Sequence, residues 1–199
     1  MKFLKNIFKT YNGKITANNL LCGMGDSEIG KDTILIKEYP FEPSIAYPEK
    51  LIKASEINSI CVDFGVLKIK IKDDIVFMSA EKKEQLKIFA EKNKIPLFAY
   101  SWNWDWILEP YLDTEYTTEN DQLVTDRLLE NGFDKIEINE IRKEVGKQMY
   151  SYNFDTMLWD WCSLSLIDVL SAMRAKYNKE DFRDFYTRAM KIEKREKQN

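Results

Sequence analysis

The sequence predicts an α+β fold, in which an antiparallel β-rich N-terminal half closed by one helix precedes an all-helical C-terminal half. From about residue 15 to residue 80, β-branched residues cluster or apolar residues alternate with polar ones, as in strands. After Pro96, apolar residues recur every three or four positions, as in helices. We therefore expect a β-rich domain over 1–97, a helical domain packed on it over 98–190, and a charged tail over 191–199.

In the first half, strands are expected over 33–38, 56–62, 66–72 and 75–78. In the third of these, Lys68, Lys70 and Lys72 alternate with apolar residues. This pattern predicts a half-buried strand whose lysine face points to solvent or to an acidic partner.

One helix is expected to close the β-rich half. Ser79 is a suitable N-cap, and Leu86, Phe89 and Ala90 form an apolar face. The helix should end near Asn93, ahead of Pro96.

The order of these elements gives a resemblance to a known family. The segment 54–60, the hairpin over 66–78 and the single helix after it resemble a bacterial pleckstrin-homology-like domain. The resemblance implies binding of peptides, lipids or other proteins, and the fold alone fixes no ligand. No dense basic cluster lies in one loop, which disfavours phosphoinositides as ligands.

Five helical segments are expected in the second half. The first follows Ser101 and is interrupted by Pro110, and the second is capped by Thr117 or Thr118 and reaches Glu130. A third begins at Asp134 with a capping-box pattern. The fourth, over 156–176, is apolar almost all round and should be central, and the fifth, over 179–190, precedes a frayed tail.

Composition excludes several classes of function. The net charge of −3 disfavours a nucleic-acid-binding protein. The absence of histidine removes Ser-His-Asp and Cys-His catalysis and histidine-ligated zinc. Three widely spaced cysteines and no signal-peptide pattern predict a reducing, cytoplasmic location, and no cofactor is expected.

The N-terminus offers a choice between packing and membrane contact. Phe3, Leu4, Ile7 and Phe8 have helical spacing beside several lysines. One short amphipathic segment binds membranes weakly, so docking on the protein core is favoured and stable membrane anchoring is not expected.

Residues 25–32 nearly match a phosphate-binding loop. Asp32 stands where that loop needs Ser or Thr, and a strand is expected where the loop needs a helix. A glycine-rich loop without a nucleotide is the favoured interpretation.

The segment 100–116 concentrates tryptophans and carboxylates. If it binds metal, the ligands would be Asp105, Glu109 and Asp113, which share one helical face. If it is catalytic, the acid–base candidates are Glu109, Asp113 and Glu115. A solvated helix face is favoured over both, and no metal is expected.

The aromatic residues form the candidate binding set. Its members are Trp102, Trp104, Trp106, Tyr111 and Trp159. Large aromatics beside acids hold ligands, but they more often anchor cores, so packing at the junction of the two halves is favoured.

The leading hypothesis is a non-catalytic protein-interaction module of a bacterium, for example an immunity-type protein that binds a toxin. The alternative is a metal-dependent hydrolase or transferase that uses the carboxylates, and a weaker one is a membrane-surface adaptor. A protein partner is expected, and the sequence leaves open whether the chain forms a homo-oligomer.

Overall fold

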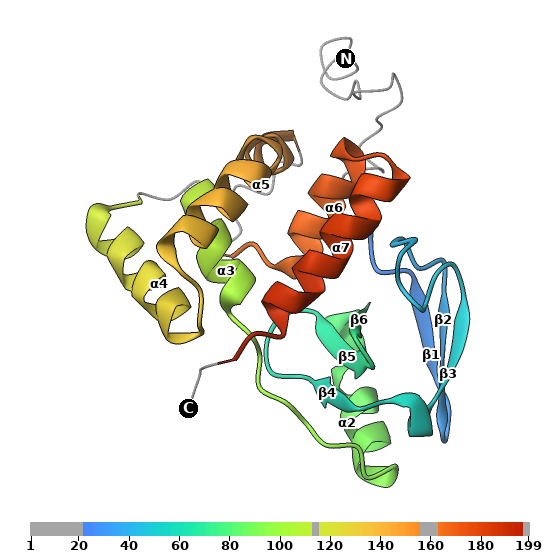
Figure 1. The fold of residues 1–199 in the computed structure, drawn as a ribbon. Coiled ribbons are helices and arrows are strands. Elements are labelled where there is room, and N and C mark those ends of the chain that lie inside the picture. The colour runs from blue at the N-terminus through green and yellow to red at the C-terminus, as the bar shows by residue number, and fades with distance from the viewer. Residues whose placement is uncertain (1–21, 113–115, 156–162, 197–199) are drawn as a thin grey trace. The chain divides into compact units, whose positions relative to one another are not determined.

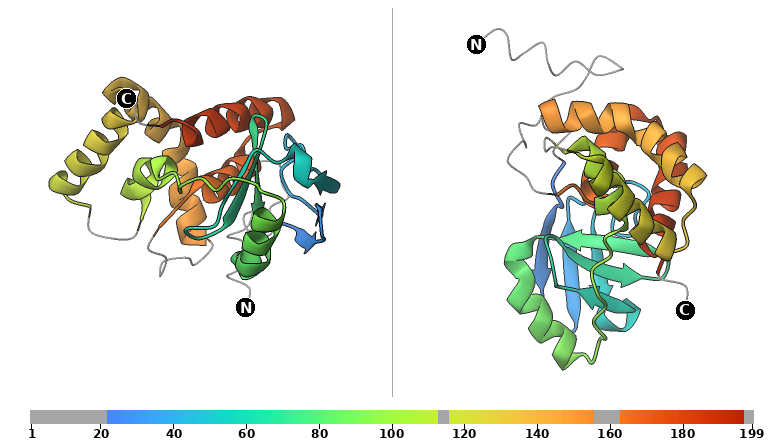
Figure 2. Two further views of the ribbon diagram at one scale, coloured as in Figure 1. Left: turned by 90° about the horizontal axis from the view of Figure 1, so that it is seen from below. Right: turned by 90° about the vertical axis from the view of Figure 1, so that its left-hand side faces the viewer.

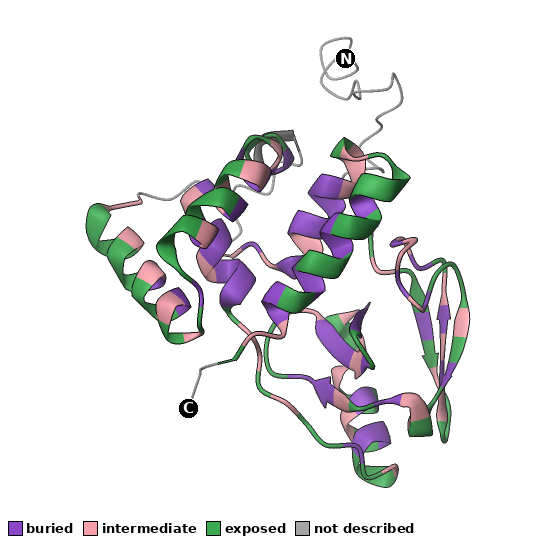
Figure 3. Cartoon of the chain, viewed as in Figure 1, coloured by how far each residue is buried: buried purple, intermediate pink, exposed green. Residues whose placement is uncertain are grey.

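The computed structural model describes residues 22–112, 116–155 and 163–196 (Figure 1). The chain divides into two compact units, Gly23–Tyr100 and the described residues from Ser101 onward together with Cys22. Each unit buries its own apolar core (Figure 3). The first unit holds antiparallel sheets and a helix, and the second is all-helical, so the predicted α+β class is confirmed.

The β unit contains two antiparallel sheets of three strands each, with sheet orders β1-β2-β3 and β4-β5-β6. The strands are β1 (Asp26–Ile29), β2 (Thr33–Lys37), β3 (Lys50–Lys53), β4 (Ser59–Cys61), β5 (Leu67–Ile71) and β6 (Asp74–Met78). Short 3-10 helices cover Ala54–Glu56 and Ala80–Lys82, and α2 spans Lys83–Lys92. Figure 2 shows α2 beside the first sheet, where it contacts β1.

The first sheet is buried on one face. Ile34 and Ile36 of β2 are fully buried, while Leu35 between them is half-buried. Ile34 pairs with Ile52 of β3, whose neighbour Leu51 is 53% exposed. The alternation of β-branched residues therefore sets both the register and the buried face.

The segment that resembles a phosphate-binding loop forms β1 and the turn into β2, so neither a phosphate loop nor the expected irregular loop is present. Gly25 has a φ of +70°, and a Cβ there would collide with the backbone carbonyl of Lys37. Glycine at this position therefore allows the two strands to approach each other closely.

The prediction that the lysine face of β5 points to solvent is wrong for Lys68 and Lys70, whereas Lys72, directly after the strand, is exposed. Lys68 is 1% exposed, and its Nζ lies 3.8 Å from the ring centroid of Tyr100. Lys70 is half-buried, and its Nζ lies 3.8 Å from the ring centroid of Phe98. The chain after α2 returns past β4, forms a bridge from Leu97 to Ile60, and places these two rings over the lysines.

The loop that follows β2 is tied to β6 by side-chain hydrogen bonds. The buried Asp74 carboxylate accepts hydrogen bonds from the Ser44 hydroxyl at 2.7 Å and from the Ile45 backbone N–H at 2.9 Å. The Phe77 N–H donates to the Tyr39 hydroxyl at 3.0 Å. These bonds satisfy polar groups that burial would otherwise leave unpaired.

Helix α2 ends where the sequence predicts, with Asn93 as its C-cap, but it begins later than expected, at Lys83. The Ser79 hydroxyl accepts a hydrogen bond from the Glu81 N–H and caps the 3-10 helix Ala80–Lys82 that precedes α2. Leu86, Phe89 and Ala90 are buried, as expected.

The helical unit contains five α-helices and one 3-10 helix within the described residues. They are α3 (Asn103–Leu108), η4 (Glu109–Tyr111), α4 (Thr118–Glu130), α5 (Lys135–Asp155), α6 (Leu166–Lys176) and α7 (Lys179–Glu193). Helix α3 contacts α4, α5 and α7. Pro110 lies in η4 directly after α3, which confirms the expected interruption.

Two predicted boundaries in this unit are wrong. The fourth helix, α6, begins only at Leu166, because Ser165 and Asp168 form a capping box there. Residues 156–162 lie outside the described part of the chain. The expected end of the last helix at residue 190 is also wrong, since α7 continues to Glu193.

The residues after α7 are held by α5. The two terminal nitrogens of Arg195 lie 2.7 and 2.8 Å from the Glu137 carboxylate. Asp134 caps α5 by accepting from the Glu137 N–H, and the Glu137 side chain pairs with Arg195. The Asp134 half of the expected capping box is therefore formed, and the Glu137 side chain makes a tertiary ion pair.

Within the described ranges, no helix is both long and apolar enough to span a lipid bilayer. The N-terminal apolar residues Phe3, Leu4, Ile7 and Phe8 lie outside those ranges, so their predicted docking stays a prediction.

Candidate binding site

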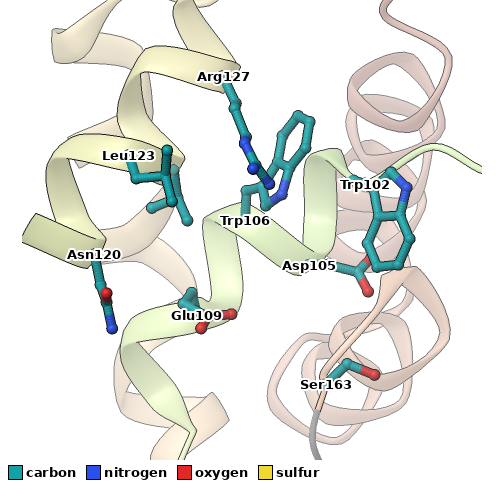
Figure 4. Close-up of a pocket in the computed structure, with 9 residues that line it drawn as sticks. Trp102, Asp105, Trp106, Glu109, Asn120, Leu123, Arg127 and Ser163 are labelled. Carbon is teal, nitrogen blue, oxygen red and sulfur yellow. The ribbon is translucent and has the colours of Figure 1, made fainter. Parts of the chain in front are cut away.

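A cleft of about 350 Å³ lies in the helical unit, between α3–η4 and α4 (Figure 4). We call it the α3–α4 cleft. Its lining residues are Trp102, Asp105, Trp106, Glu109, Asn120, Leu123, Val124, Arg127 and Ser163. A volume of this size falls in the range of small-ligand pockets, about 300–1,000 Å³, and admits one large side chain.

The two main walls have the same residue spacing. Along α3 and into η4, the lining residues stand at 102, 105, 106 and 109, and along α4 they stand at 120, 123, 124 and 127. These are positions i, i+3, i+4 and i+7, which form one face of a helix. Each wall therefore consists of residues at helical spacing, from Trp102 through α3 into η4 on one side and from α4 on the other.

The opposite face of α3 is anchored in the core. Trp104 is fully buried, and its Nε1–H donates to the Ala189 carbonyl of α7 at 3.1 Å. The buried Asn103 amide donates to the carbonyls of Ile192 and Arg195, both at 2.8 Å. Because these bonds fix α3 to α7, the cleft wall is held in place from behind.

Arg142 of α5 connects the two walls. Its guanidinium donates to the carbonyls of Trp106 and Ile107, both at 3.2 Å, at the carboxyl end of α3, where cations are favoured. It also pairs with Asp121 of α4 at 2.8 Å. A hydrogen bond from the Tyr116 hydroxyl and the Arg142 pair hold the pKa of Asp121 below its usual value.

The short helix η4 is fixed through Tyr111. Its hydroxyl donates to the Arg142 carbonyl at 2.6 Å, and burial raises the pKa of Tyr111 to about 12. The ring lies against Gly146 of α5, where a Cβ would lie 2.8 Å from the Tyr111 hydroxyl oxygen. Tyr111 is therefore packed in the core of the helical unit.

Glu109 and Arg127 are the charged groups that distinguish the cleft. Glu109 is half-buried, burial raises the pKa of its carboxyl group, and no described residue pairs with it. The exposed Arg127 places its guanidinium 5.5 Å from the ring centroid of Trp106. Asp105 is 6% exposed and lies on the same wall as Glu109.

Apolar surface borders these charges. Trp102 is 40% exposed on one wall, and Leu123 is 52% exposed on the other. Figure 4 shows Leu123 directed from α4 toward α3, while Trp102 lies above Asp105 at the end of the cleft away from α4. Exposed apolar groups beside polar ones are typical of contact surfaces.

The structure separates the predicted site residues into three groups. Trp102, Trp106, Asp105 and Glu109 line the cleft, whereas Trp104 and Tyr111 are buried in the core. The remaining candidates, Asp113, Glu115 and Trp159, lie outside the described residues. In the ranges that the structure describes, no three His, Cys, Asp or Glu side chains are grouped to hold a metal ion.

Sequence reasoning missed most of the second wall. Asn120, Val124, Arg127 and Ser163 were not expected at a site, and Leu123 was expected only as an apolar helix residue. The signal was available, because 120–127 repeats the spacing of 102–109. What the sequence did not show is that these two faces oppose each other.

Comparisons with protein-family models, with curated proteins and with solved structures found no match for this chain.

Proposed function

We propose that this protein is a non-catalytic protein-interaction module that holds part of a partner in the α3–α4 cleft. The observation that carries the proposal is exposed apolar surface on both walls, Trp102 on one and Leu123 on the other. The helices behind them are fixed by Asn103 and Arg142. A preorganised aromatic anchor in a partly desolvated pocket is the usual centre of a protein interface.

A partner of the immunity type, a protein toxin sequestered by this chain, is one concrete form of the proposal. The net charge of −3 and the 32% of charged residues suit a well-solvated protein that binds another protein. We also propose that the β unit is pleckstrin-homology-like. Its support is the pattern of two three-stranded antiparallel sheets followed by α2.

One observation favours the enzyme alternative. The pKa of Glu109 is raised by burial, as a general acid requires, and Asp105 lies on the same wall. A metal-dependent hydrolase or transferase would bind Mn²⁺ in a manner that depends on Glu109. Mn²⁺ titration of the wild type and of Glu109→Gln, followed by electron paramagnetic resonance, tests this; equal responses would remove the alternative.

The interaction proposal is tested by affinity capture from the native cell with quantitative mass spectrometry. The baits are the wild type, Trp102→Ala, Leu123→Ala and the control Leu51→Ala, an exposed leucine of the β unit. We expect one protein to be retained by the wild type and by the control and to be lost from both cleft variants. Equal retention of every captured protein by all four baits would overturn the proposal.

A further inference from the structure

We propose that the α3–α4 cleft receives a cationic side chain, a lysine or an arginine of the protein partner. This inference rests on the proposed function and adds the chemical class of the group that enters. It depends on three features of the cleft: the carboxylate of Glu109, the exposed ring of Trp102, and the charge balance of the lining.

Glu109 is the first feature. Its carboxylate is half-buried and has neither a hydrogen bond nor an ion pair with any described residue. In contrast, Glu137 and Glu144 of the same unit each face an arginine. A carboxylate that has lost part of its hydration without gaining a partner is stabilised when a cation approaches.

Trp102 is the second feature. It is 40% exposed and lines the same wall of the cleft as Asp105 and Glu109. Lysine and arginine side chains present an apolar stem and a charged end. The stem can pack on the Trp102 ring while the charged end extends along the same wall toward the Glu109 carboxylate.

The third feature is the charge of the lining. Two carboxylates, Asp105 and Glu109, stand against one guanidinium, that of Arg127. The Arg127 guanidinium lies 5.5 Å from the ring centroid of Trp106, so the cation of the lining is placed at Trp106. The lining therefore has an excess of acid, which complements a cation.

The probes for a test are blocked tripeptides whose central residue is lysine, arginine, norleucine or glutamate. Binding is followed through the indole N–H resonances of Trp102 and Trp106 in ¹⁵N-labelled full-length protein. We expect the lysine and arginine peptides to shift these resonances with saturation. Norleucine has the same stem without the charge, so its peptide should bind about fivefold more weakly. Equal binding of norleucine, or no shift with either cationic peptide, would overturn the inference.

Variants that remove either a negative or a positive charge from the cleft provide a second test by the same titration. Glu109→Gln should weaken binding of the lysine peptide about fivefold, and Arg127→Gln should strengthen it, since a like charge is removed. Glu140→Gln on α5 makes the same charge change at an exposed position outside the cleft and should have no effect. The reverse signs, with the glutamate peptide bound best, would assign an anionic ligand instead.

Failure of this inference is distinguishable from failure of the proposed function. If capture of the partner depends on Trp102 and Leu123 but is unchanged by Glu109→Gln, the cleft binds a partner without a cation. If capture is independent of Trp102 and Leu123, the proposed function fails whatever the peptides do.

Discussion

At the scale of single residues, the carboxyl groups of the helical unit have pKa values shifted in different directions because their neighbours differ. Glu144 accepts hydrogen bonds from both terminal nitrogens of Arg188, at 2.7 and 2.9 Å, and another from the Tyr177 hydroxyl. The Arg188 bonds are the largest cause of its lowered pKa. Glu109 has only burial acting on it, which raises its pKa. The first is therefore satisfied within the fold, and the second is available to a ligand.

The Arg188–Glu144 pair predicts a specific pH dependence of stability. Because the folded-state pKa of Glu144 lies below its usual 4.5, its ionised form stabilises the protein above that pH, and the contribution is lost as pH falls. Glu144→Gln should lower the free energy of unfolding by about 1 kcal/mol at neutral pH and by much less in acid. Urea denaturation at both pH values measures this, with Glu140→Gln as the control. Equal losses at the two pH values would contradict the assignment.

At Gly146, helix propensity favours alanine, whereas packing against Tyr111 favours glycine. Replacing an interior helical glycine by alanine normally stabilises a helix by about 1 kcal/mol. Here the new methyl group would lie 2.8 Å from the Tyr111 hydroxyl oxygen and 3.0 Å from a ring carbon. We expect the cost of the clash to exceed the gain in helix propensity. Gly146→Ala should therefore lower the free energy of unfolding by about 1–3 kcal/mol in chemical denaturation. Tyr111→Leu in the same chain should reduce the penalty, and a stabilised single variant would contradict the predicted clash.

At the scale of elements, local signals in the sequence predicted much of the fold. The β5–β6 hairpin, the Ser79 cap and the Thr117 cap depend on neighbouring residues, so they are readable in the chain. The burial of Lys68 depends on Tyr100, which is remote in sequence, and this could not be read from a period of two. The late start of α6 depends on a capping box that competes with a continuous apolar pattern.

The cleft could be predicted only in part, because it also depends on contacts between residues remote in sequence. Trp102, Asp105 and Glu109 were recognised because aromatics and acids concentrate there. The second wall carries only ordinary helix residues, and it becomes a wall through the Arg142 contacts that join α4 to α3. Tertiary contacts of this kind have no local sequence signal.

Asn103 predicts how α3 and α7 depend on each other. Its side chain makes three hydrogen bonds, two to carbonyls at the end of α7 and one from the Asn131 amide. Asn103→Ala should lower the free energy of unfolding by about 2–3 kcal/mol, since buried polar partners lose their bonds. Hydrogen exchange should accelerate in the last turn of α7. Asn120→Ala, in the cleft wall, is the matched control, and equal exchange in both variants would contradict the anchoring role.

At the scale of the whole molecule, each unit has its own core and its own polar ties. We therefore predict that Asp74→Ala, which removes the acceptor for Ser44 and Ile45, destabilises the β unit by about 2–3 kcal/mol. In hydrogen exchange, the faster amides should be confined to Gly23–Tyr100, while the cleft residues keep their protection. Equal acceleration in both units would show that they unfold together.

The most direct test of a binding role for the α3–α4 cleft is calorimetric titration of the captured partner into purified wild type, Trp102→Ala, Leu123→Ala and Leu51→Ala. We predict that each cleft variant binds at least about tenfold more weakly, as expected for residues at the centre of an interface, and that Leu51→Ala binds like the wild type. Unchanged affinity in both cleft variants would contradict the assignment of this cleft as the binding site.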